Sequence, residues 1–404
     1  MPRKMSVRDL EVRGRRVFVR VDFNVPMSAG RVIDDSRIRA ALPTINLLLD
    51  RGARVVLASH LGRPKGKPVQ ELSLRPAAER LAELLGRPVE MAADCVGPEV
   101  EAKSRALAGG QVLLLENLRY HAGETSNDDG FAAGLAALAD LYVNDAFGTA
   151  HRAHASVAGI TRHLRPAASG LLVQKELEML GRLRDRPDKP YVALLGGAKV
   201  SDKLDLIERL MASIDVLLIG GAMGHTFLKA RGIPVGISKV EEDRLQAARD
   251  IMARAEERRV RLLMAIDHVA AAKPEAGVAT TVTDGPALPD GMMGLDVGPR
   301  TREAFDAEIR RARTIFWNGP LGVFEVPPFD AGTRAAARSV AAVEAFAVVG
   351  GGDSVAAVNS MGLGSRLTHL STGGGASLEF LSGVELPGLT ALTDAPGGRD
   401  GGAR

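Results

Sequence analysis

Short apolar runs recur along the chain, and the residues between them repeat at helical spacing. The runs lie at Val17–Phe23, Ala53–Ser59, Val112–Leu115, Leu141–Val143, Tyr191–Leu195, Val216–Ile219, Arg261–Ile266, Thr314–Trp317 and Ala345–Val349. Each is close to continuously apolar, which is typical of parallel strands that are covered on both faces. No antiparallel alternation of apolar and polar residues is evident. The pattern therefore predicts an α/β protein built on parallel sheets.

The stretch between the first two runs has the spacing of an amphipathic helix. Its apolar residues follow Ser36 on one helical face: Ile38, Leu42, Ile45, Leu48, Leu49. Gly52 then indicates a C-terminal stop. The segment 73–86 repeats this design and ends on Gly86. We expect one helix in each segment.

The length of the chain indicates two domains. At 404 residues it exceeds what one hydrophobic core usually supports, since domains typically hold about 100–200 residues. We expect two Rossmann-like, three-layer α/β/α domains with parallel sheets, covering residues 1–168 and 187–380. A helical hinge is expected at 169–186, because its apolar positions lead into a charged, proline-containing stretch, Arg182 to Pro190. The Gly- and Arg-rich tail, 397–404, is expected to be disordered.

Charge and cysteine content exclude several classes of protein. The formal net charge is only +3 and no long run of like charges occurs, so no nucleic-acid partner is indicated. The single cysteine, Cys95, cannot form an internal disulfide, which fits a reducing cytoplasm. The charged N-terminus lacks a signal-peptide core, and no apolar run approaches the roughly 18 residues that span a membrane. We expect a cytoplasmic monomer without a membrane partner.

Polar and cationic residues follow the first four apolar runs. Ligands of open parallel sheets bind at the carboxyl ends of the strands, so these positions are candidates for a site. Arg37, His60, Arg63, Arg119 and Arg152 suit a small, doubly anionic ligand, because guanidinium groups bind phosphate and carboxylate in a bidentate manner. Any one of these arginines alone has an equal chance of being a solvated loop residue, but five cations at adjacent strand ends favour a site.

Two other polar residues lie at the same predicted edge. Asp22 and Asn24 follow the first run and are suited to bind ligand hydroxyls. His151 and His154 also lie near, but no third metal ligand accompanies them, so we interpret them as hydrogen-bonding residues.

Glycines follow the apolar runs of the second half. They form Gly196-Gly197, Gly220-Gly221, Asn318-Gly319, Gly350-Gly351-Gly352 and Gly373-Gly374-Gly375. Glycine lets backbone N–H groups approach phosphate oxygens, and a following helix N-terminus adds its dipole. A single Gly-Gly pair more often marks a tight turn, but repetition at strand ends favours phosphate binding. Neither GxxxxGK[ST] nor GxGxxG occurs, so the P-loop and the dinucleotide fingerprint lack support.

These strings together resemble phosphoglycerate kinase. The similar segments run in order from about residue 7 to residue 393: Val21 to Pro26, His60 to Pro64, Glu116 to Arg119, Asp145 to Arg152, Gly196 to Lys203, Trp317 to Glu325, Gly350 to Ser354, and Ser371 to Glu379. The resemblance implies direct Mg²⁺-dependent phosphoryl transfer between 1,3-bisphosphoglycerate and ADP, giving 3-phosphoglycerate and ATP. It also implies that the C-terminal segment, 381–396, returns to the first domain, and Pro387-Gly388-Leu389 matches this part of the family.

The resemblance assigns a role to each candidate residue. Phosphoglycerate would bind the N-terminal domain at Asp22, Phe23, Asn24, Arg37, His60, Leu61, Gly62, Arg63, Arg119 and Arg152. Nucleotide would bind the C-terminal domain at Lys203, Glu325, Gly350, Gly351, Gly352, Asp353 and Ser354, with Glu325 on the ribose and Asp353 towards Mg²⁺. The catalytic groups, which meet the transferring phosphoryl, would be Arg37, Lys199, Gly373 and Gly374.

Some positions in the second half depart from the family pattern. They are Met264 to His268, Met292, and Gly224-His225.

Two other functions are weighed against the kinase. A non-catalytic nucleotide-binding protein on the same fold would be expected to lack Arg37, Lys199 or Asp353, and all three are present. A nicotinamide oxidoreductase is disfavoured by the missing GxGxxG and by the arginines.

Overall fold

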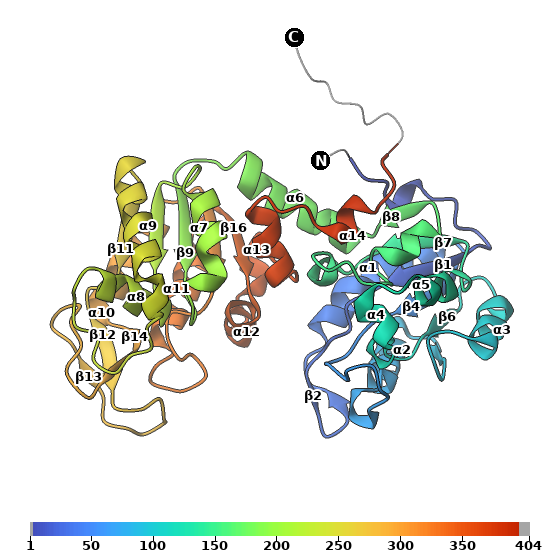
Figure 1. The fold of residues 1–404 in the computed structure, drawn as a ribbon, viewed down its shortest axis with the longest axis horizontal. Helices are drawn as coiled ribbons and strands as arrows, with labels where there is room; N and C mark the ends of the chain where they lie inside the picture. Colours follow the sequence, from blue (N-terminus) through green and yellow to red (C-terminus); the bar gives the residue numbers. More distant parts are fainter. Residues whose placement is uncertain (1–2, 396–404) are drawn as a thin grey trace, which may run out of the picture. The chain divides into compact units, whose positions relative to one another are not determined.

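The computed structural model describes residues 3–395, and its residue contacts divide the chain into two units (Figure 1). The first unit runs up to Leu177 and takes in the chain again from Glu385, and the second spans Glu178–Val384. The predicted tail at 397–404 lies outside the described residues. Among the described residues, none of the helices is long and apolar enough to cross a membrane.

The first unit is built on a six-stranded parallel sheet in the order β5-β6-β4-β1-β7-β8. Its strands are β1 (Arg16–Arg20), β4 (Arg54–Ala58), β5 (Glu90–Met91), β6 (Val112–Leu114), β7 (Leu141–Asn144) and β8 (Ala167–Ser169). Its helices are α1 (Ser36–Asp50), α2 (Arg75–Leu85), α3 (Pro98–Ala106), α4 (Ala122–Ser126), α5 (Asp129–Ala136) and α14 (Pro387–Thr390). A small hairpin joins β2 (Met27–Ser28) to β3 (Arg31–Val32).

Both faces of this sheet are covered, which confirms the predicted layers. Val17 and Val19 of β1 belong to one apolar cluster with residues of α1 and α2. Phe18, on the opposite face of the strand, is also fully buried and stacks on Tyr142. Strands with two buried faces need apolar residues at successive positions, which explains the continuous runs in the sequence.

The two predicted helices are present and end at glycines. Asp34 accepts a hydrogen bond from the first backbone N–H of α1, that of Ser36, and the helix buries Ile38 and Ile45. Gly52 follows it with φ near +73°, and Gly86 follows α2 with φ near +63°. Side chains with a Cβ rarely adopt this left-handed conformation, so glycine ends each helix sharply.

The second unit has its own six-stranded parallel sheet, in the order β11-β10-β9-β15-β16-β17. Its strands are β9 (Tyr191–Leu195), β10 (Val216–Ile219), β11 (Arg261–Met264), β15 (Thr314–Asn318), β16 (Phe346–Gly350) and β17 (His369–Leu370). Its helices are α7 (Leu204–Leu210), α8 (Met223–Ala230), α9 (Leu245–Glu257), α10 (Pro299–Ile309), α11 (Ala331–Ala342), α12 (Gly352–Ser360) and α13 (Gly375–Leu381). Val192 and Leu194 pack with α10 and α11, while Ala193 on the other face is equally buried.

An antiparallel sheet in this unit was not predicted. It joins β12 (His268–Ala271), β13 (Thr281–Val282) and β14 (Met293–Val297) in the order β13-β12-β14. The two predicted parallel sheets are confirmed, and this small sheet is an addition to them. The sequence did not reveal it, because β12 is short and wholly buried and therefore shows no alternation. The predicted strand Arg261–Ile266 also ends earlier, at Met264. Asp267 instead accepts hydrogen bonds from the backbone N–H groups of Arg300 and Thr301 at the start of α10.

One long helix carries the chain from the first unit into the second. This helix, α6 (Leu171–Asp185), contains the division between the units at Leu177 and Glu178. Its first turn is held by the first unit, because Thr44 accepts from the N–H of Leu171 (2.8 Å) and Asp145 from that of Leu172 (2.9 Å). The C-terminal segment joins the same unit through Gly388, whose N–H donates to the carbonyl of Ala150 (2.8 Å).

Candidate functional site

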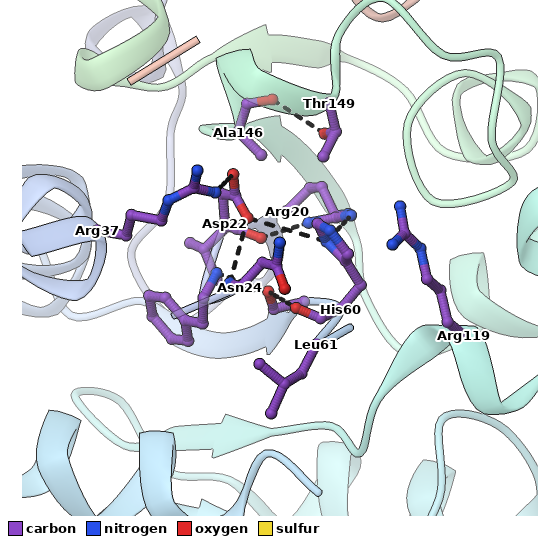
Figure 2. A network of polar contacts seen from close by, with 12 residues as sticks. Arg20, Asp22, Asn24, Arg37, His60, Leu61, Arg119, Ala146 and Thr149 are labelled. Carbon is purple, nitrogen blue, oxygen red and sulfur yellow. Dashed lines mark hydrogen bonds and ion pairs between the residues drawn. The ribbon is translucent and has the colours of Figure 1, made fainter. Parts of the chain in front are cut away.

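The central strands of the first sheet end together. Arg20 at the end of β1 is in register with Ala58 of β4 and with Asn144 of β7. The loops that follow these strands therefore meet at one edge of the sheet. Figure 2 shows the side chains gathered there, with Arg37 and Arg119 on opposite sides of His60. We call His60, Arg37, Arg119 and Arg152 the basic cluster. The charges of these three arginines and of a fourth, Arg20, act on His60.

Asp22 and Asn24 organise one side of the basic cluster. Asp22 Oδ2 accepts from the Arg37 guanidinium (2.5 Å), and its Oδ1 accepts from the N–H of Asn24 (3.2 Å). Asn24 Oδ1 accepts in turn from the N–H of Gly62 (2.9 Å). The loops after β1 and β4 are thereby tied together, and Arg37 is held at the edge of the sheet.

His60 is buried in the middle of the basic cluster. Its side chain is 5% exposed, and burial together with the charges of the four arginines holds its pKa well below the usual value of 6.5. Asp22 Oδ1 lies 3.9 Å from His60 Nδ1, too far for a hydrogen bond. The histidine is therefore a neutral hydrogen-bonding group at neutral pH rather than a further cation.

Two arginines of the basic cluster, Arg119 and Arg152, make their hydrogen bonds to uncharged groups. Arg119 donates to the Gly62 carbonyl (2.7 Å), and burial, followed by repulsion from Arg152 and Arg20, lowers its pKa to about 10. Arg152 is half-buried and donates from Nε to His151 Nε2 (3.1 Å). This concentration of positive charge favours an anionic ligand. Arg63 follows Gly62 in the loop after β4, and it is exposed.

The remaining predicted residues of this edge support the loops. Phe23 is fully buried, and its N–H donates to Ser59 Oγ (2.8 Å). Leu61 is also buried, and both its N–H and its carbonyl bond to the Asn117 side chain. These hydrogen bonds fix the backbone of both loops, while the two side chains are buried in the core.

Sequence reasoning missed three buried polar residues behind the basic cluster. Arg20, Asn117 and Glu124 are all fully buried. Arg20 interrupts an otherwise apolar strand, and a cation in such a run was a signal that could have been used. Asn117 and Glu124 carry no comparable signal, because polar residues are ordinary in loops and short helices.

The strands of the second sheet also end together. Leu195 is in register with Ile219 and with Asn318, which pairs in turn with Gly350. A cavity of about 270 Å³ opens beside these ends. Its lining combines glycine backbone at Gly197, Gly220 and Gly221 with apolar side chains such as Leu295 and Leu321. Glu325 and Asp353 also line it.

The glycines of this unit fall into two kinds. A Cβ on Gly196 would lie 2.1 Å from the Pro320 carbonyl oxygen, and one on Gly319 would lie 2.4 Å from the Gly196 carbonyl oxygen. These glycines let neighbouring loops pack against each other. Gly352, Gly374 and Gly375 have no atom within 4 Å of such a Cβ, so open space faces them. This second kind leaves room for a ligand to approach the backbone.

Lys203 and Asp353 lie close together at these strand ends. Lys203 is mostly buried, and burial lowers its pKa, although the charges of Asp202 and Asp353 act in the opposite direction. Asp353 lies in the first turn of α12, and both Lys199 and Glu325 are exposed. A carboxylate beside an ammonium and a glycine loop is suited to bind the charged end of a nucleotide and its cation.

Sequence reasoning also missed Glu241, which supports a loop of the second unit. Its Oε2 accepts from the backbone N–H groups of Val200 (2.5 Å) and Ser201 (3.2 Å). Its Oε1 accepts from the Ser201 hydroxyl (2.6 Å). Glu241 therefore fixes the turn between Lys199 and Lys203.

Ser354 and Gly373 already have partners in the protein. The Ser354 hydroxyl accepts from the N–H of Gly319 (2.7 Å), and the N–H of Gly373 donates to Ser371 Oγ (3.3 Å). Gly351 has φ near +89° at the start of α12, and Gly374 has φ near +53° at the start of α13. Both loops therefore adopt a backbone that glycine permits at little steric cost.

Two of the departures from the family pattern line the cavity. His225 and His268 face each other with ring centroids 5.6 Å apart, and both line it. Burial lowers the pKa of His225 to about 3 and that of His268 to about 4, so both are neutral at neutral pH. Met292 is half-buried, and its neighbour Met293 is the methionine that lines the cavity.

Comparison with known proteins gives a consistent result. A family model described as phosphoglycerate kinase matches residues 7–384. A phosphoglycerate kinase of Moorella thermoacetica is 56% identical over 391 residues, covering 97% of this chain and 99% of that protein. One of Anaeromyxobacter dehalogenans is 56% identical over 388 residues, covering 95% and 98%.

Solved structures agree with the sequence comparisons. A phosphoglycerate kinase structure from Coxiella burnetii matches with a TM-score of 0.84 and 40% identity, covering 96% of this chain and 98% of that chain. One from Pyrococcus horikoshii matches with a TM-score of 0.85 and 34% identity. It also covers 96% of this chain and 98% of that chain.

Proposed function

The chain belongs to the phosphoglycerate kinase family, and from that premise we propose which residues of each unit bind and transfer the phosphoryl group. It is a phosphotransferase of glycolysis. The reaction moves a phosphoryl group between 1,3-bisphosphoglycerate and ADP and yields 3-phosphoglycerate and ATP. Both alternatives weighed from the sequence, a non-catalytic protein and a nicotinamide oxidoreductase, are set aside by this assignment.

The basic cluster supports the proposal for 3-phosphoglycerate more than any other observation. A small molecule with one phosphate and one carboxylate matches an edge where Arg37, Arg119 and Arg152 lie around a neutral histidine. The proposed binding residues are Asp22, Phe23, Asn24, Arg37, His60, Leu61, Gly62, Arg63, Arg119 and Arg152. Phe23 and Leu61 would contribute backbone only, because their side chains are buried in the core.

For the nucleotide we propose the loops of the second unit. Lys203 and the segment Gly350 to Ser354 would bind the phosphates, and Glu325 the ribose. Gly352 supports this, since nothing stands in front of its backbone. The cavity lined by Leu295 and Leu321 is apolar enough for an adenine ring.

The residues present fit a magnesium ion. Asp353 offers an exposed carboxylate, and Mg²⁺ is commonly held by one or two carboxylates together with the phosphates of the substrate. When bound, the ion would neutralise charge on the phosphate oxygens. We propose Asp353 as its protein ligand.

The transfer itself needs no general base. The acceptor in the ATP-consuming direction is a carboxylate, which is already ionised at neutral pH. We propose that Arg37 and Lys199, together with Gly373 and Gly374, stabilise the charge of the transferring group. Asp22 would hold Arg37 for this task through their ion pair.

We propose that the two units close on the substrates around α6 as a hinge. In-line transfer requires reacting atoms roughly 3–3.5 Å apart and exclusion of water. The acceptor residues belong to one unit and the nucleotide residues to the other. A single substrate then has little preference for a closed form, whereas the pair binds both units and shifts the equilibrium.

Small-angle scattering on the free protein, each binary complex and the ternary complex with a non-transferring nucleotide analogue measures closure. We expect compaction only with both ligands. Equal radii of gyration in the free and ternary states would contradict the hinge, and full compaction with nucleotide alone would contradict the requirement for both substrates.

A coupled assay with 3-phosphoglycerate, MgATP and a reporter of acyl phosphate tests the activity directly. We expect acyl phosphate to form, and its formation to stop when Mg²⁺ is chelated. Absence of product at any Mg²⁺ concentration would contradict the proposed function. We also propose that the protein is a cytoplasmic monomer. The free, buried thiol of Cys95 fits a reducing compartment.

A further inference from the structure

Arg20 is a fully buried arginine directly behind the basic cluster. It ends β1, it is 0% exposed, and its guanidinium lies beside the ring of His60 (Figure 2). A ligand at the sheet edge cannot touch a side chain with no exposed surface. Charged residues are almost never fully buried unless they are paired, so Arg20 requires an explanation.

Each nitrogen of the Arg20 guanidinium has a partner inside the protein. Its Nε donates to Ser156 Oγ (2.9 Å), one terminal nitrogen donates to the carbonyl of Val21, and the other approaches His60 Nδ1 (3.1 Å). The Ser156 hydroxyl donates onward to Glu124 Oε1 (2.7 Å), and its N–H donates to Glu124 Oε2 (2.9 Å). A continuous buried chain therefore runs from Glu124 to His60.

Glu124 is the counter-charge at the far end of this chain. Burial raises the pKa of its carboxyl. The interaction with His154, whose Nδ1 lies 3.7 Å away, the charge of Arg20 and the hydrogen bonds from Ser156 outweigh this, so the pKa lies below its usual value. Glu124 is therefore ionised at neutral pH. The buried cation is balanced without using Asp22, which stays paired with Arg37.

The contact with Arg20 decides where His60 carries its proton. An arginine side chain has only donors, so the nitrogen that it approaches must accept. Nδ1 of His60 is therefore the bare nitrogen, and a neutral ring then carries its hydrogen on Nε2. The other groups that act on His60 from neighbouring elements are Asp22, Arg37, Arg119 and Arg152, and the three arginines disfavour a second proton.

We propose that Arg20, held by Ser156 and Glu124, is a positioning residue that fixes His60 as the Nε2–H tautomer. His60 then presents one N–H donor, and no charge, to an anion in the basic cluster. The tautomer follows from the ligand-free geometry alone. Only the identity of the anion, 3-phosphoglycerate, rests on the proposed function.

Nitrogen NMR of the imidazole rings in the ligand-free protein tests the tautomer. The His60 signals are assigned by their absence in His60→Leu. We expect a protonated Nε2 and a bare Nδ1 in the unmodified protein, unchanged between about pH 6 and pH 8. In Arg20→Met we expect a mixture of tautomers and a raised pKa of His60. A proton on Nδ1 in the unmodified protein would overturn the proposal.

Tyr142→Phe is the matched control. The Tyr142 hydroxyl donates to the Ser156 carbonyl (2.9 Å), so this variant loses a buried hydrogen bond of the same region without touching Arg20. It should keep the Nε2–H tautomer. If Arg20→Met fails to fold, Arg20→Lys keeps the charge but cannot reach all three acceptors, and the same change of tautomer is expected. An unchanged His60 spectrum in the folded arginine variant would overturn the proposal.

Calorimetry of 3-phosphoglycerate binding, with Arg20→Met made in the unmodified protein and in His60→Leu, separates two effects of Arg20. One is its positioning of His60, and the other is its long-range attraction for the anion. Loss of the Arg20 charge should weaken binding whether or not His60 is present. Loss of the tautomer can matter only when His60 is present. We therefore expect Arg20→Met to weaken binding at least about threefold more in the unmodified background than in His60→Leu, and equal weakening would overturn the proposal. A protein with the expected tautomer that does not bind 3-phosphoglycerate would instead contradict the proposed function.

Discussion

The two units offer an anion opposite kinds of surface. The basic cluster uses charged side chains, and a layer of buried polar residues supports it: Glu124 balances Arg20, and Asn117 fixes the loop at Leu61. The loops proposed to bind nucleotide offer open space in front of glycine backbone, as at Gly352 and Gly374. Side-chain recognition therefore needs counter-charges and a buried scaffold, while backbone recognition needs mainly the absence of side chains.

The prediction with the largest expected effect concerns the two cations, one from each unit, that are proposed to stabilise the transferring phosphoryl group. Alanine at Arg37 or at Lys199 should lower kcat by about 10²–10³ and change the KM values little, because each removes a group proposed to act on the transition state. Steady-state kinetics with both substrates varied measures this. Lys189→Ala, which removes an exposed lysine paired with Asp215, should keep the original kcat. A raised KM with normal kcat in either main variant would assign that residue to ground-state binding.

A second experiment tests whether the two sites are separable. Arg152→Ala should raise KM for 3-phosphoglycerate by about 10- to 100-fold, since it removes a hydrogen bond to a charged ligand, and should leave KM for ATP nearly unchanged. Glu325→Ala should do the reverse, with about a tenfold effect on ATP. Equal effects of either variant on both substrates would contradict the division of binding between the units.

A pair of glycine variants sharpens the account of the second unit. Gly196→Ala places a Cβ against the Pro320 carbonyl and should destabilise the protein by about 1–3 kcal/mol. Gly352→Ala meets no atom, so thermal stability should be kept while KM for ATP rises. Calorimetry and kinetics on both variants measure this. A Gly352→Ala enzyme with unchanged KM would show that nucleotide does not approach this backbone.

The smallest effect concerns Asp145, which is buried beside the first turn of α6. Burial raises the pKa of its carboxyl to about 7, so the native state holds a proton between roughly pH 4 and pH 7 that the unfolded state has lost. Stability from this group therefore falls as pH rises through that window. Asp145→Asn should therefore gain stability relative to the unmodified protein as the pH rises from 4 to 8.

Melting temperatures at several pH values measure this gain, and Asp140→Asn is its control. At Asp140 burial raises the pKa, but hydrogen bonds from Arg16 outweigh it and lower the pKa below the usual value. Its stabilising effect is present at neutral pH and lost on acidification, so Asp140→Asn should be destabilised at pH 8 and not at low pH. A gain for Asp145→Asn that is equal at every pH would contradict ionisation as the cause.

Much of the fold followed from the sequence because it depends on local pattern. Continuous apolar runs such as Tyr191–Leu195 became strands with two buried faces, and glycines such as Gly52 ended helices. The candidate residues could be gathered in advance because parallel strands bring their carboxyl ends to one edge. The antiparallel strand β12 was not predicted, because a short, wholly buried strand shows no alternation of apolar and polar residues.

The sequence by itself determined which residues lie at the strand ends and hence the proposed chemistry of each unit. Only the tertiary structure decided what supports them. Arg20 meets His60 across 40 positions and Ser156 across 136, and Gly196 differs from Gly352 only in what packs in front of it. Apolar periodicity is read from neighbouring residues, whereas the pairing of buried polar groups depends on contacts that exist only once the chain has folded.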